Sequence, residues 1–386
     1  MKRLISLILC ALVLTGCGKQ EQIPAASSSI APPVVEEPPI EPPPAELLEV
    51  ERDPIADLLS SMTMEEQVGQ LFFVRCPAEN AAEDVSAYHL GGYILFGRDT
   101  KDKTAAEVIE TIHSYQSSAA IPLLIGVDEE GGTVVRVSSN GNLRASKFSS
   151  PQKVYQSGGM EAILSDTAEK DRLLAALGFN VNLAPVADLS TNASDFIYPR
   201  AFGQDAEATA DYTAAVTAQM AKDGMGSVLK HFPGYGNNAD THTGIAIDTR
   251  PLEQFWEEDF LPFTAGMDAG GDATAVLVSH NIVQAMDADL PASLSPAVHA
   301  VLRDDLGFTG VIMTDDLAMD AVAAYAEDGA VAVMAIEAGN DLVITTDYRT
   351  QIPKVMEAVE SGRLSEETIT AACRRVLEWK QALGLI

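Results

Sequence analysis

Eight short apolar runs, rich in Val, Ile and Leu, constrain the fold of this chain more than any other feature. They lie at residues 70–75, 91–97, 122–128, 179–188, 226–232, 274–280, 310–316 and 341–346. Longer stretches with helical periodicity separate them, a pattern that is typical of a parallel sheet built from βα units. Eight such units predict an α/β fold, a single (β/α)₈ barrel of the TIM type spanning residues 54–386.

Helix start and stop signals fill the intervals between these runs. Capping-box patterns and a Ser-Pro pair predict helix starts at Thr63/Glu66, Thr104/Glu107 and Ser295-Pro296. Glycines predict helix ends near Gly224, Gly270 and Gly307.

The first 16 residues read as an export signal. Two positive charges precede an apolar run over residues 4–14 that is too short to span a membrane, which needs ~20 residues. Leu14-Thr15-Gly16-Cys17 resembles a bacterial lipobox, so we expect a lipid on Cys17 as the first mature residue. That lipid would hold the exported protein on the outer face of the cell membrane. Ordinary cleavage beside an incidental cysteine is the alternative.

Residues 17–53 are rich in Pro and Glu, with "PPVVEEPPIEPPP" at their centre. Proline at this density supplies no backbone donors for a strand ladder, and acidic residues repel one another. This segment is therefore predicted to be a disordered, extended tether between the lipid and the barrel.

Charge and cysteine usage exclude several classes of protein. A net charge of −31 argues against a nucleic-acid partner, because neutralising phosphates needs clustered Lys and Arg. Once the signal is removed, Cys76 and Cys373 remain besides Cys17, too few for a disulfide framework. The sequence alone does not decide whether Cys76 and Cys373 form a disulfide bond.

Polar residues fall at the carboxyl ends of the apolar runs, where barrel enzymes build their active sites. They are Arg75, Asp128, Asp188, Lys230, His231, His280 and Asp315. The glycine-rich segment "KHFPGYGNNADTHTG", residues 230–244, follows the fifth run and adds Asp240 and His242 at the same face. We leave His280 outside the site, because it equally suits a structural histidine.

Several long motifs resemble glycoside hydrolase family 3, and specifically its bacterial β-N-acetylglucosaminidase branch. They are "IGVDEEGGTVVR", "NVNLAPVADL", "YPRAFG", "KHFPGYGNNADTH", "LVSHNIV", "MTDDLAMDA" and "AIEAGNDLVI", in the order of the family. The resemblance covers residues 60–386. Tyr235 and Thr241 depart from the residues that many relatives carry there, and neither departure removes a catalytic group. The sequence stops at "WKQALGLI", where family members with a second sheet domain would continue, so we expect the barrel alone.

The resemblance implies a retaining exo-β-N-acetylglucosaminidase, and it assigns Asp315 as the nucleophile. A carboxylate held below a sugar ring can attack the anomeric carbon and form a glycosyl-enzyme intermediate. Asp316 is the competitor, and since neighbouring strand residues face opposite sides, only one of the two can face the barrel axis.

For the acid/base group the resemblance implies His242, oriented by Asp240. Histidine titrates near pH ~6.5, and a carboxylate bonded to one ring nitrogen supports the protonated form. We expect the glycine-rich loop to bring this pair over the sugar after binding.

The resemblance further implies that five residues contact the non-reducing sugar, and these are Asp128, Arg136, Arg200, Lys230 and His231. A simple ion pair with a nearby carboxylate is the alternative role for each of the cations. The expected substrate is an oligosaccharide or muropeptide derived from the cell wall. No cofactor or metal is expected, and the protein is expected to be a monomer.

Three alternatives stay open. The chain could be a β-glucosidase or another β-glycosidase of the same family, or a lipid-anchored protein that only binds sugars. It could also be a metal-dependent hydrolase with His231, Asp240, His242 and His280 as ligands. The spacing suits a metal poorly, because Asp240 and His242 lie on a loop rather than on rigid elements.

Overall fold

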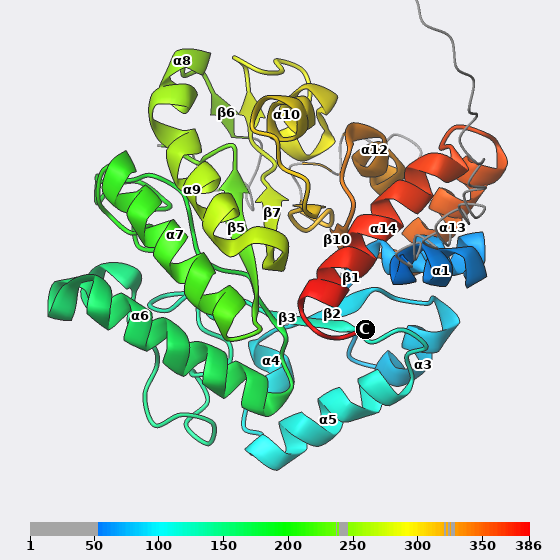
Figure 1. Ribbon diagram of the computed structural model, residues 1–386, viewed down its shortest axis with the longest axis horizontal. Helices are drawn as coiled ribbons and strands as arrows, with labels where there is room; N and C mark the ends of the chain where they lie inside the picture. Colours follow the sequence, from blue (N-terminus) through cyan, green and yellow to red (C-terminus); the bar gives the residue numbers. More distant parts are fainter. Residues whose placement is uncertain (1–52, 237, 239–245, 320–321, 323–324, 326–328) are drawn as a thin grey trace, which may run out of the picture. The chain divides into compact units, whose positions relative to one another are not determined.

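Eight parallel strands form one sheet that curls round on itself at the centre of the barrel (Figure 1). The structure, a computed structural model, describes residues 53–236, 238, 246–319, 322, 325 and 329–386. The strands are β1 (Phe72–Arg75), β2 (Gly92–Leu95), β3 (Leu124–Val127), β4 (Val181–Asn182), β5 (Gly226–Phe232), β7 (Thr274–Val278), β9 (Ile312–Thr314) and β10 (Val343–Thr345). Each lies within one of the eight apolar runs.

The strand order follows the chain, and the last strand returns to the first. β1 pairs with both β2 and β10, and the sheet continues from β2 through β3, β4, β5 and β7 to β9. A parallel bridge between Met313 and Leu342 links β9 to β10, with the Thr314 amide donating to the Leu342 carbonyl at 3.2 Å. The sheet is thus a nearly closed barrel, and the predicted fold class is confirmed.

Helices surround the strands in the view of Figure 1. The described α-helices are α1 (Pro54–Ser61), α2 (Met64–Gln70), α3 (Ala81–Ala87), α4 (Gly97–Thr100), α5 (Ala105–Ser117), α6 (Pro151–Leu177), α7 (Ala206–Lys222), α8 (Leu252–Gln254), α9 (Phe260–Gly270), α10 (Pro296–Ala300), α12 (Val331–Ala338), α13 (Tyr348–Glu360) and α14 (Glu366–Ala382). None of the described helices is long and apolar enough to cross a membrane.

The predicted helix starts are observed. Thr63 and Thr104 both form complete capping boxes, with Glu66 and Glu107 as the reciprocal partners. Ser295 caps α10, whose first residue is Pro296. At the end of α9 the left-handed residue is Gly271 rather than Gly270, because the helix runs one residue further than expected.

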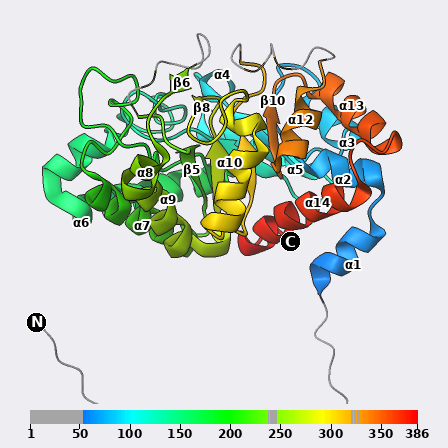
Figure 2. The same cartoon turned by 90° about the horizontal axis from the view of Figure 1, so that it is seen from above.

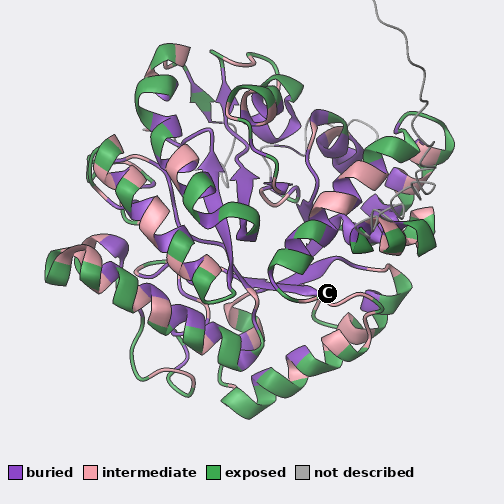
Figure 3. Cartoon of the chain, viewed as in Figure 1, coloured by how far each residue is buried: buried purple, intermediate pink, exposed green. Residues whose placement is uncertain are grey.

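Alternate strand residues divide between two apolar layers, which explains why apolar residues occupy consecutive positions in the strands. Phe73, Ile94 and Met313 pack together inside the barrel, whereas Phe72 and Tyr93 pack against the helices. The strands are accordingly buried while the helices keep exposed outer faces (Figure 3). Inside the barrel, a Cβ at residue 126 would lie 2.4 Å from the Phe73 ring, so Gly126 leaves the room that this ring fills.

A second, two-stranded parallel sheet was not expected from the sequence. It pairs β6 (Ile247–Asp248) with β8 (Ile282–Val283), and the turned view of Figure 2 places both strands near the upper edge of the barrel. Cys76 and Cys373 are both buried and free, so they form no disulfide.

Candidate active site

Charged side chains from separate strands meet around one cavity of about 630 Å³. The charged and imidazole side chains in its lining are Arg75, Asp128, Arg136, Arg200, Lys230, His231, Asp315 and Asp316. The structure therefore brings together all the predicted site residues that it describes. Each lies at or just after the carboxyl end of a strand, or in the loops that follow, which is the face where barrel enzymes bind their substrates.

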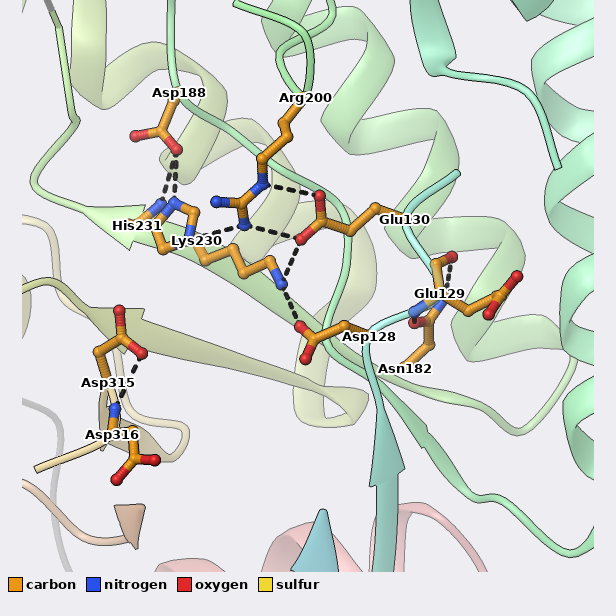
Figure 4. Close-up of polar contacts among 10 residues, drawn as sticks. All are labelled: Asp128, Glu129, Glu130, Asn182, Asp188, Arg200, Lys230, His231, Asp315 and Asp316. Atoms are coloured by element: carbon orange, nitrogen blue, oxygen red, sulfur yellow. Dashed lines mark hydrogen bonds and ion pairs between the residues drawn. The ribbon is translucent and has the colours of Figure 1, made fainter. Parts of the chain in front are cut away.

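Lys230 lies at the centre of a buried ion cluster beside this cavity (Figure 4). Its Nζ atom is 2.6 Å from Asp128 Oδ1 and 2.7 Å from Glu130 Oε1. Burial alone would lower the pKa of Lys230, but these two carboxylates outweigh burial and raise it. Lys230 is therefore a fixed positive charge at neutral pH, and Asp128 is held toward the cavity as an acceptor.

Glu130 joins Lys230 to Arg200. Arg200 donates from Nε at 3.0 Å and from Nη2 at 2.8 Å to the two carboxylate oxygens of Glu130. Burial would raise the pKa of Glu130, yet Arg200 and Lys230 hold it well below its usual range. Glu130 is absent from the cavity lining, so its carboxylate fixes the two cations from behind.

His231 extends the cluster to Asp188. Its Nε2 lies 3.1 Å from Arg200 Nη2, and its Nδ1 lies 2.7 Å from Asp188 Oδ2. A guanidinium can only donate, so Nε2 accepts and Nδ1 carries the proton that is donated to Asp188. This arrangement fixes both the tautomer and the orientation of the ring, and it explains the buried Asp188 at the end of the fourth apolar run.

An irregularity in β5 lets two consecutive residues serve the same cavity. The register between β5 and β7 shifts between Leu229 and Phe232, so Lys230 and His231 together occupy the space of one partner residue. Such a bulge changes the direction of its side chains. Both residues consequently reach the cavity, although alternation along a regular strand would separate them.

Asp315 and Asp316 follow β9 and point in opposite directions in Figure 4. Asp315 points toward the side of His231, and its Oδ1 accepts from the Asp316 amide at 2.8 Å. Asp316 accepts from the Ala318 amide at 3.0 Å. Burial raises the pKa of Asp316, and so does the neighbouring charge of Asp315, whereas the hydrogen bond from the Ala318 amide lowers it. The net effect is a raised pKa. The two carboxylates thus have different environments within one cavity lining.

His280 lies behind this pair and is fully buried. Its ring nitrogens lie 2.7 Å from Ser293 Oγ and 3.0 Å from the Asp316 carbonyl oxygen. A histidine with both nitrogens engaged holds the backbone after β9 in place, as the structural alternative predicts. Among the residues that the structure describes, no group of three or more His, Cys, Asp or Glu is arranged to hold a metal ion.

Arg75 and Arg136 flank the ring of Phe96 in the cavity lining. Their Cζ atoms lie 4.4 Å and 5.8 Å from the ring centroid. The Nε atom of each arginine is buried and has no hydrogen-bond partner, and neither side chain forms an ion pair within the described part of the chain. Since buried donors normally find acceptors, this part of the lining suits a ligand with acceptor oxygens.

Asp240 and His242 lie outside the described residues, as does Cys17. The described neighbours show where their segment starts. The Tyr235 amide donates to Asp188 Oδ1 at 2.7 Å, beside His231.

Glu129 and Glu130 are not among the site residues predicted from the sequence. Glu129 is fully buried and accepts from the amides of Arg136, Val137 and Ser138, so it holds the loop that carries Arg136. The available signal was the acidic run "DEEGG" at the end of an apolar strand. Carboxylates there must be paired when buried, and consecutive ones point to different partners.

Comparisons with known proteins identify the family of this chain. Residues 63–379 match the family model described as "Glycosyl hydrolase family 3 N terminal domain". A beta-hexosaminidase of Xanthomonas oryzae pv. oryzae is 33% identical over 305 residues, which cover 76% of this chain and 88% of that protein.

Solved structures give the same family. A family 3 β-N-acetylglucosaminidase from Paenibacillus sp. str. FPU-7 superposes with a TM-score of 0.78 at 31% identity, covering 84% of this chain and 63% of that one. A β-N-acetylhexosaminidase from Beutenbergia cavernae superposes with a TM-score of 0.71 at 29% identity, covering 84% of this chain and 99% of that one.

Proposed function

This chain belongs to glycoside hydrolase family 3 and is a glycosidase, and on that premise we propose that it is a retaining exo-β-N-acetylglucosaminidase. It removes terminal N-acetylglucosamine from the non-reducing end of glycans derived from peptidoglycan. A β-glucosidase, or another β-glycosidase of the family, is the second candidate. A lipid-anchored protein that binds sugars without cleaving them is the third.

One observation carries the proposal: Asp315 shares a single cavity with the cluster of Asp128, Lys230, Arg200 and His231. Fixed charges of both signs suit the many hydroxyls of a sugar, because charged donors and acceptors form its strongest hydrogen bonds. With the ring held there, Asp315 attacks the anomeric carbon and the leaving oxygen departs with a proton. Water then opens the glycosyl-enzyme ester, and the configuration is retained.

His242, oriented by Asp240, supplies that proton and later takes one from the water. Support comes from the sequence of the segment and from its described start, since Tyr235 is bonded to Asp188 next to His231. An imidazole paired with a carboxylate can serve as acid in the first step and base in the second.

Arg75 supports an anionic sugar on the leaving side. N-acetylmuramic acid, the sugar that alternates with N-acetylglucosamine in peptidoglycan, carries a lactyl carboxylate. Arg75 offers a buried Nε donor without a partner beside Phe96, and a carboxylate would satisfy it. Arg75→Met should therefore lower kcat/KM for N-acetylglucosaminyl-N-acetylmuramic acid about 10- to 100-fold and leave kcat/KM for chitobiose unchanged, since a charged hydrogen bond contributes ~1.5–3 kcal/mol.

The protein acts outside the cell, held to the membrane by lipid on Cys17 and spaced from it by residues 18–53. The lipobox sequence and the proline content of the segment support this location. We further propose that the enzyme works as a monomer and needs no cofactor or metal.

Two chromogenic substrates test the activity. The purified protein should cleave p-nitrophenyl N-acetylglucosaminide well and p-nitrophenyl glucoside poorly. The first released sugar should be the β anomer by nuclear magnetic resonance, and a chelator should not change the rate. Preference for the glucoside would select the second candidate, and binding without turnover of either substrate would select the third.

A further inference from the structure

The chain on both sides of residues 239–245 is attached to one arginine. Arg250 donates from Nε and Nη2 to Asp248, with Nη2 2.8 Å from Oδ2. Its Nη1 donates to both oxygens of Asp259, at 3.0 and 2.8 Å. Its Nη2 also lies 3.4 Å from the carbonyl oxygen of Gly234. All three guanidinium nitrogens are therefore engaged.

This group, which we call the Arg250 clamp, consists of Arg250, Asp248 and Asp259. The Arg250 side chain is 17% exposed, and the two aspartates are 2% and 1% exposed. The Phe255 ring lies 4.3 Å from Cζ. A planar fork that is stacked and bonded in this way cannot be replaced by a lysine ammonium.

The residues before and after 239–245 are both linked to Asp248. Before the segment, Asn238 Nδ2 donates to Asp248 Oδ2 at 3.0 Å. On the returning side, Asp248 belongs to β6, which is paired with β8 through the Ile282 amide and the Ala246 carbonyl at 2.8 Å. Asn238 and Ala246, the residues that flank 239–245, are thus fixed relative to one another.

Two glycines give the clamp its space, which explains the motif "GYG" at residues 234–236. A Cβ at residue 234 would lie 2.3 Å from Asp259 Oδ1, and one at residue 236 would lie 2.7 Å from Arg250 Cζ. Both residues also have positive φ, +126° and +55°. The backbone is in direct contact with the clamp at these points, so movement of the clamp would move the segment.

The segment is also tied to the cavity. Asp188 accepts from the Tyr235 amide through Oδ1 and contacts His231 Nδ1 through Oδ2. Tyr235 lies between Gly234 and Gly236, the two residues in contact with the clamp. The clamp and Asp188 therefore both hold residues 234–236.

We propose that Arg250 is a positioning residue for the acid/base group, acting through the clamp on the two ends of residues 239–245. The inference rests on the proposed function, in which this segment carries His242 and Asp240. Fixing both ends of a short segment restricts the positions of its side chains, and the rate of proton transfer depends steeply on such positioning. Arg250, Asp248 and Asp259 are not among the residues that line the cavity.

Arg250→Lys in the full chain tests the proposal. General acid catalysis contributes ~10²–10⁴-fold, mostly for poor leaving groups. We expect kcat on chitobiose to fall about 10- to 100-fold, a partial loss of that contribution. Formation of the glycosyl-enzyme from p-nitrophenyl N-acetylglucosaminide should change less than threefold, because nitrophenolate needs little protonation. Azide should accelerate turnover of the nitrophenyl substrate, because it attacks without deprotonation and replaces the poorly placed base.

Arg303→Lys is the matched control. Arg303 is 21% exposed, pairs with the buried Asp341 and has its Cζ 5.7 Å from the Phe308 ring. Asp341 accepts from the amide of Ile312, the first residue of β9, so this pair lies at the opposite end of the barrel. We expect a comparable loss of thermal stability with no dependence on the leaving group and no effect of azide.

The outcomes separate the two hypotheses. If His242→Ala shows neither leaving-group dependence nor azide rescue, the proposed acid/base pair is wrong. If His242→Ala shows both and Arg250→Lys behaves like Arg303→Lys, the clamp is only structural and the inference is overturned. Should Arg250→Lys fail to fold, Asp248→Asn, which keeps the side-chain shape, must show the same leaving-group dependence. Unchanged affinity for N-acetylglucosamine by calorimetry would confirm that the cavity is intact.

Discussion

At the scale of single residues, the direction of one side chain decides which of two adjacent carboxylates can attack a sugar. Asp315 points toward the side of His231, whereas Asp316 is turned away and bonded to the Ala318 amide. Burial raises the pKa of Asp316, with Asp315 adding to the rise, which makes Asp316 the poorer anion. The geometry thus favours Asp315 as the nucleophile.

Asp315→Ala should lower turnover of every substrate on the order of 10⁶-fold, the scale seen when a catalytic nucleophile is removed. Asp316→Ala should cost far less, because it leaves the nucleophile in place. An activated 2-fluoro or 5-fluoro glycoside should label Asp315, as read by mass spectrometry of the digested protein. Label on Asp316 would reverse the assignment.

Glu130 shows how a residue outside the cavity can set the chemistry within it. It has 2% side-chain exposure and bonds both Arg200 and Lys230. Without its charge, the buried Lys230 and the partly buried Arg200 would keep only the more distant or shared charges of Asp128 and Asp188. Breaking a buried pair in this way costs ~3–5 kcal/mol.

Glu130→Gln should therefore lower the free energy of unfolding by about that amount. It should also lower kcat/KM up to ~10²-fold, the effect of misplacing positioning groups by about 1 Å. Urea denaturation and the affinity for N-acetylglucosamine would measure the two effects. Glu337→Gln removes an exposed pair with Arg363 and should change stability by less than ~1 kcal/mol. Equal effects from both variants would contradict a special role for Glu130.

At the scale of elements, the barrel could be predicted because its strands are buried on both faces. Runs such as 226–232 and 274–280 have apolar residues at consecutive positions, for example 228–229 and 275–278, and they contain β5 and β7. The pair β6 and β8 could not be predicted, because each is two residues long and has no apolar run. Its pairing depends on where the barrel places Ala246 and Ile282, which no local pattern encodes.

The site, too, could be predicted only in part. Asp128, Lys230 and Asp315 could be predicted from the sequence, because each is a charged residue at the end of an apolar run. The partners of Lys230 could not be predicted, because Glu130 lies 100 positions from it along the chain. Only the closed barrel brings Lys230 Nζ to 2.7 Å from Glu130 Oε1. The bulge that turns both Lys230 and His231 to the cavity likewise arises from the register between two strands.

Helix α14 packs on α2 through a buried lysine. Lys380 is fully buried, and its Nζ donates to Gln70 Oε1 at 2.6 Å. Burial lowers the pKa of Lys380 from 10.5 to about 7. Above pH 7 the folded protein thus holds this amine neutral while the unfolded chain still binds the proton. Lys380 by itself therefore makes stability rise with pH above 7 and fall as pH drops through 7. Asp171 and Asp259, whose pKa values burial raises to about 7, act in the opposite direction as pH rises toward 7.

Between pH 7 and 8.5 the free energy of unfolding should rise by up to about 1.4 kcal/mol per pH unit, the limit for one proton. Lys380→Met should remove this slope, as measured by urea denaturation. Cys76 and Cys373 titrate higher, since burial raises the pKa of their thiols to about 11 and 12. Lys222→Met, at the exposed end of α7, should keep the slope. The same slope in Lys380→Met would mean that another group causes it.

At the scale of the whole molecule, an acidic protein concentrates cations at one place. The chain has 56 acidic and 25 basic residues, yet four of the basic ones, Arg75, Arg136, Arg200 and Lys230, line one cavity. All of these residues lie in the compact unit from Arg52 to Ile386. The cavity cations and the proposed nucleophile Asp315 therefore belong to one unit, and the proposed lipidation residue Cys17 belongs to the other.

This division of roles predicts that location and catalysis can be separated. Cys17→Ser should block lipid attachment and move the protein from the membrane pellet to the soluble fraction, or leave it unprocessed. In wild-type protein, mass spectrometry should find a lipid-modified Cys17 at the mature amino terminus. Turnover of p-nitrophenyl N-acetylglucosaminide by the purified variant should match the wild type within twofold, because a small soluble substrate reaches the cavity equally in both. Soluble wild-type protein that begins at another residue would refute the lipid anchor. A large loss of turnover in Cys17→Ser would instead show that the leader contributes to the active barrel.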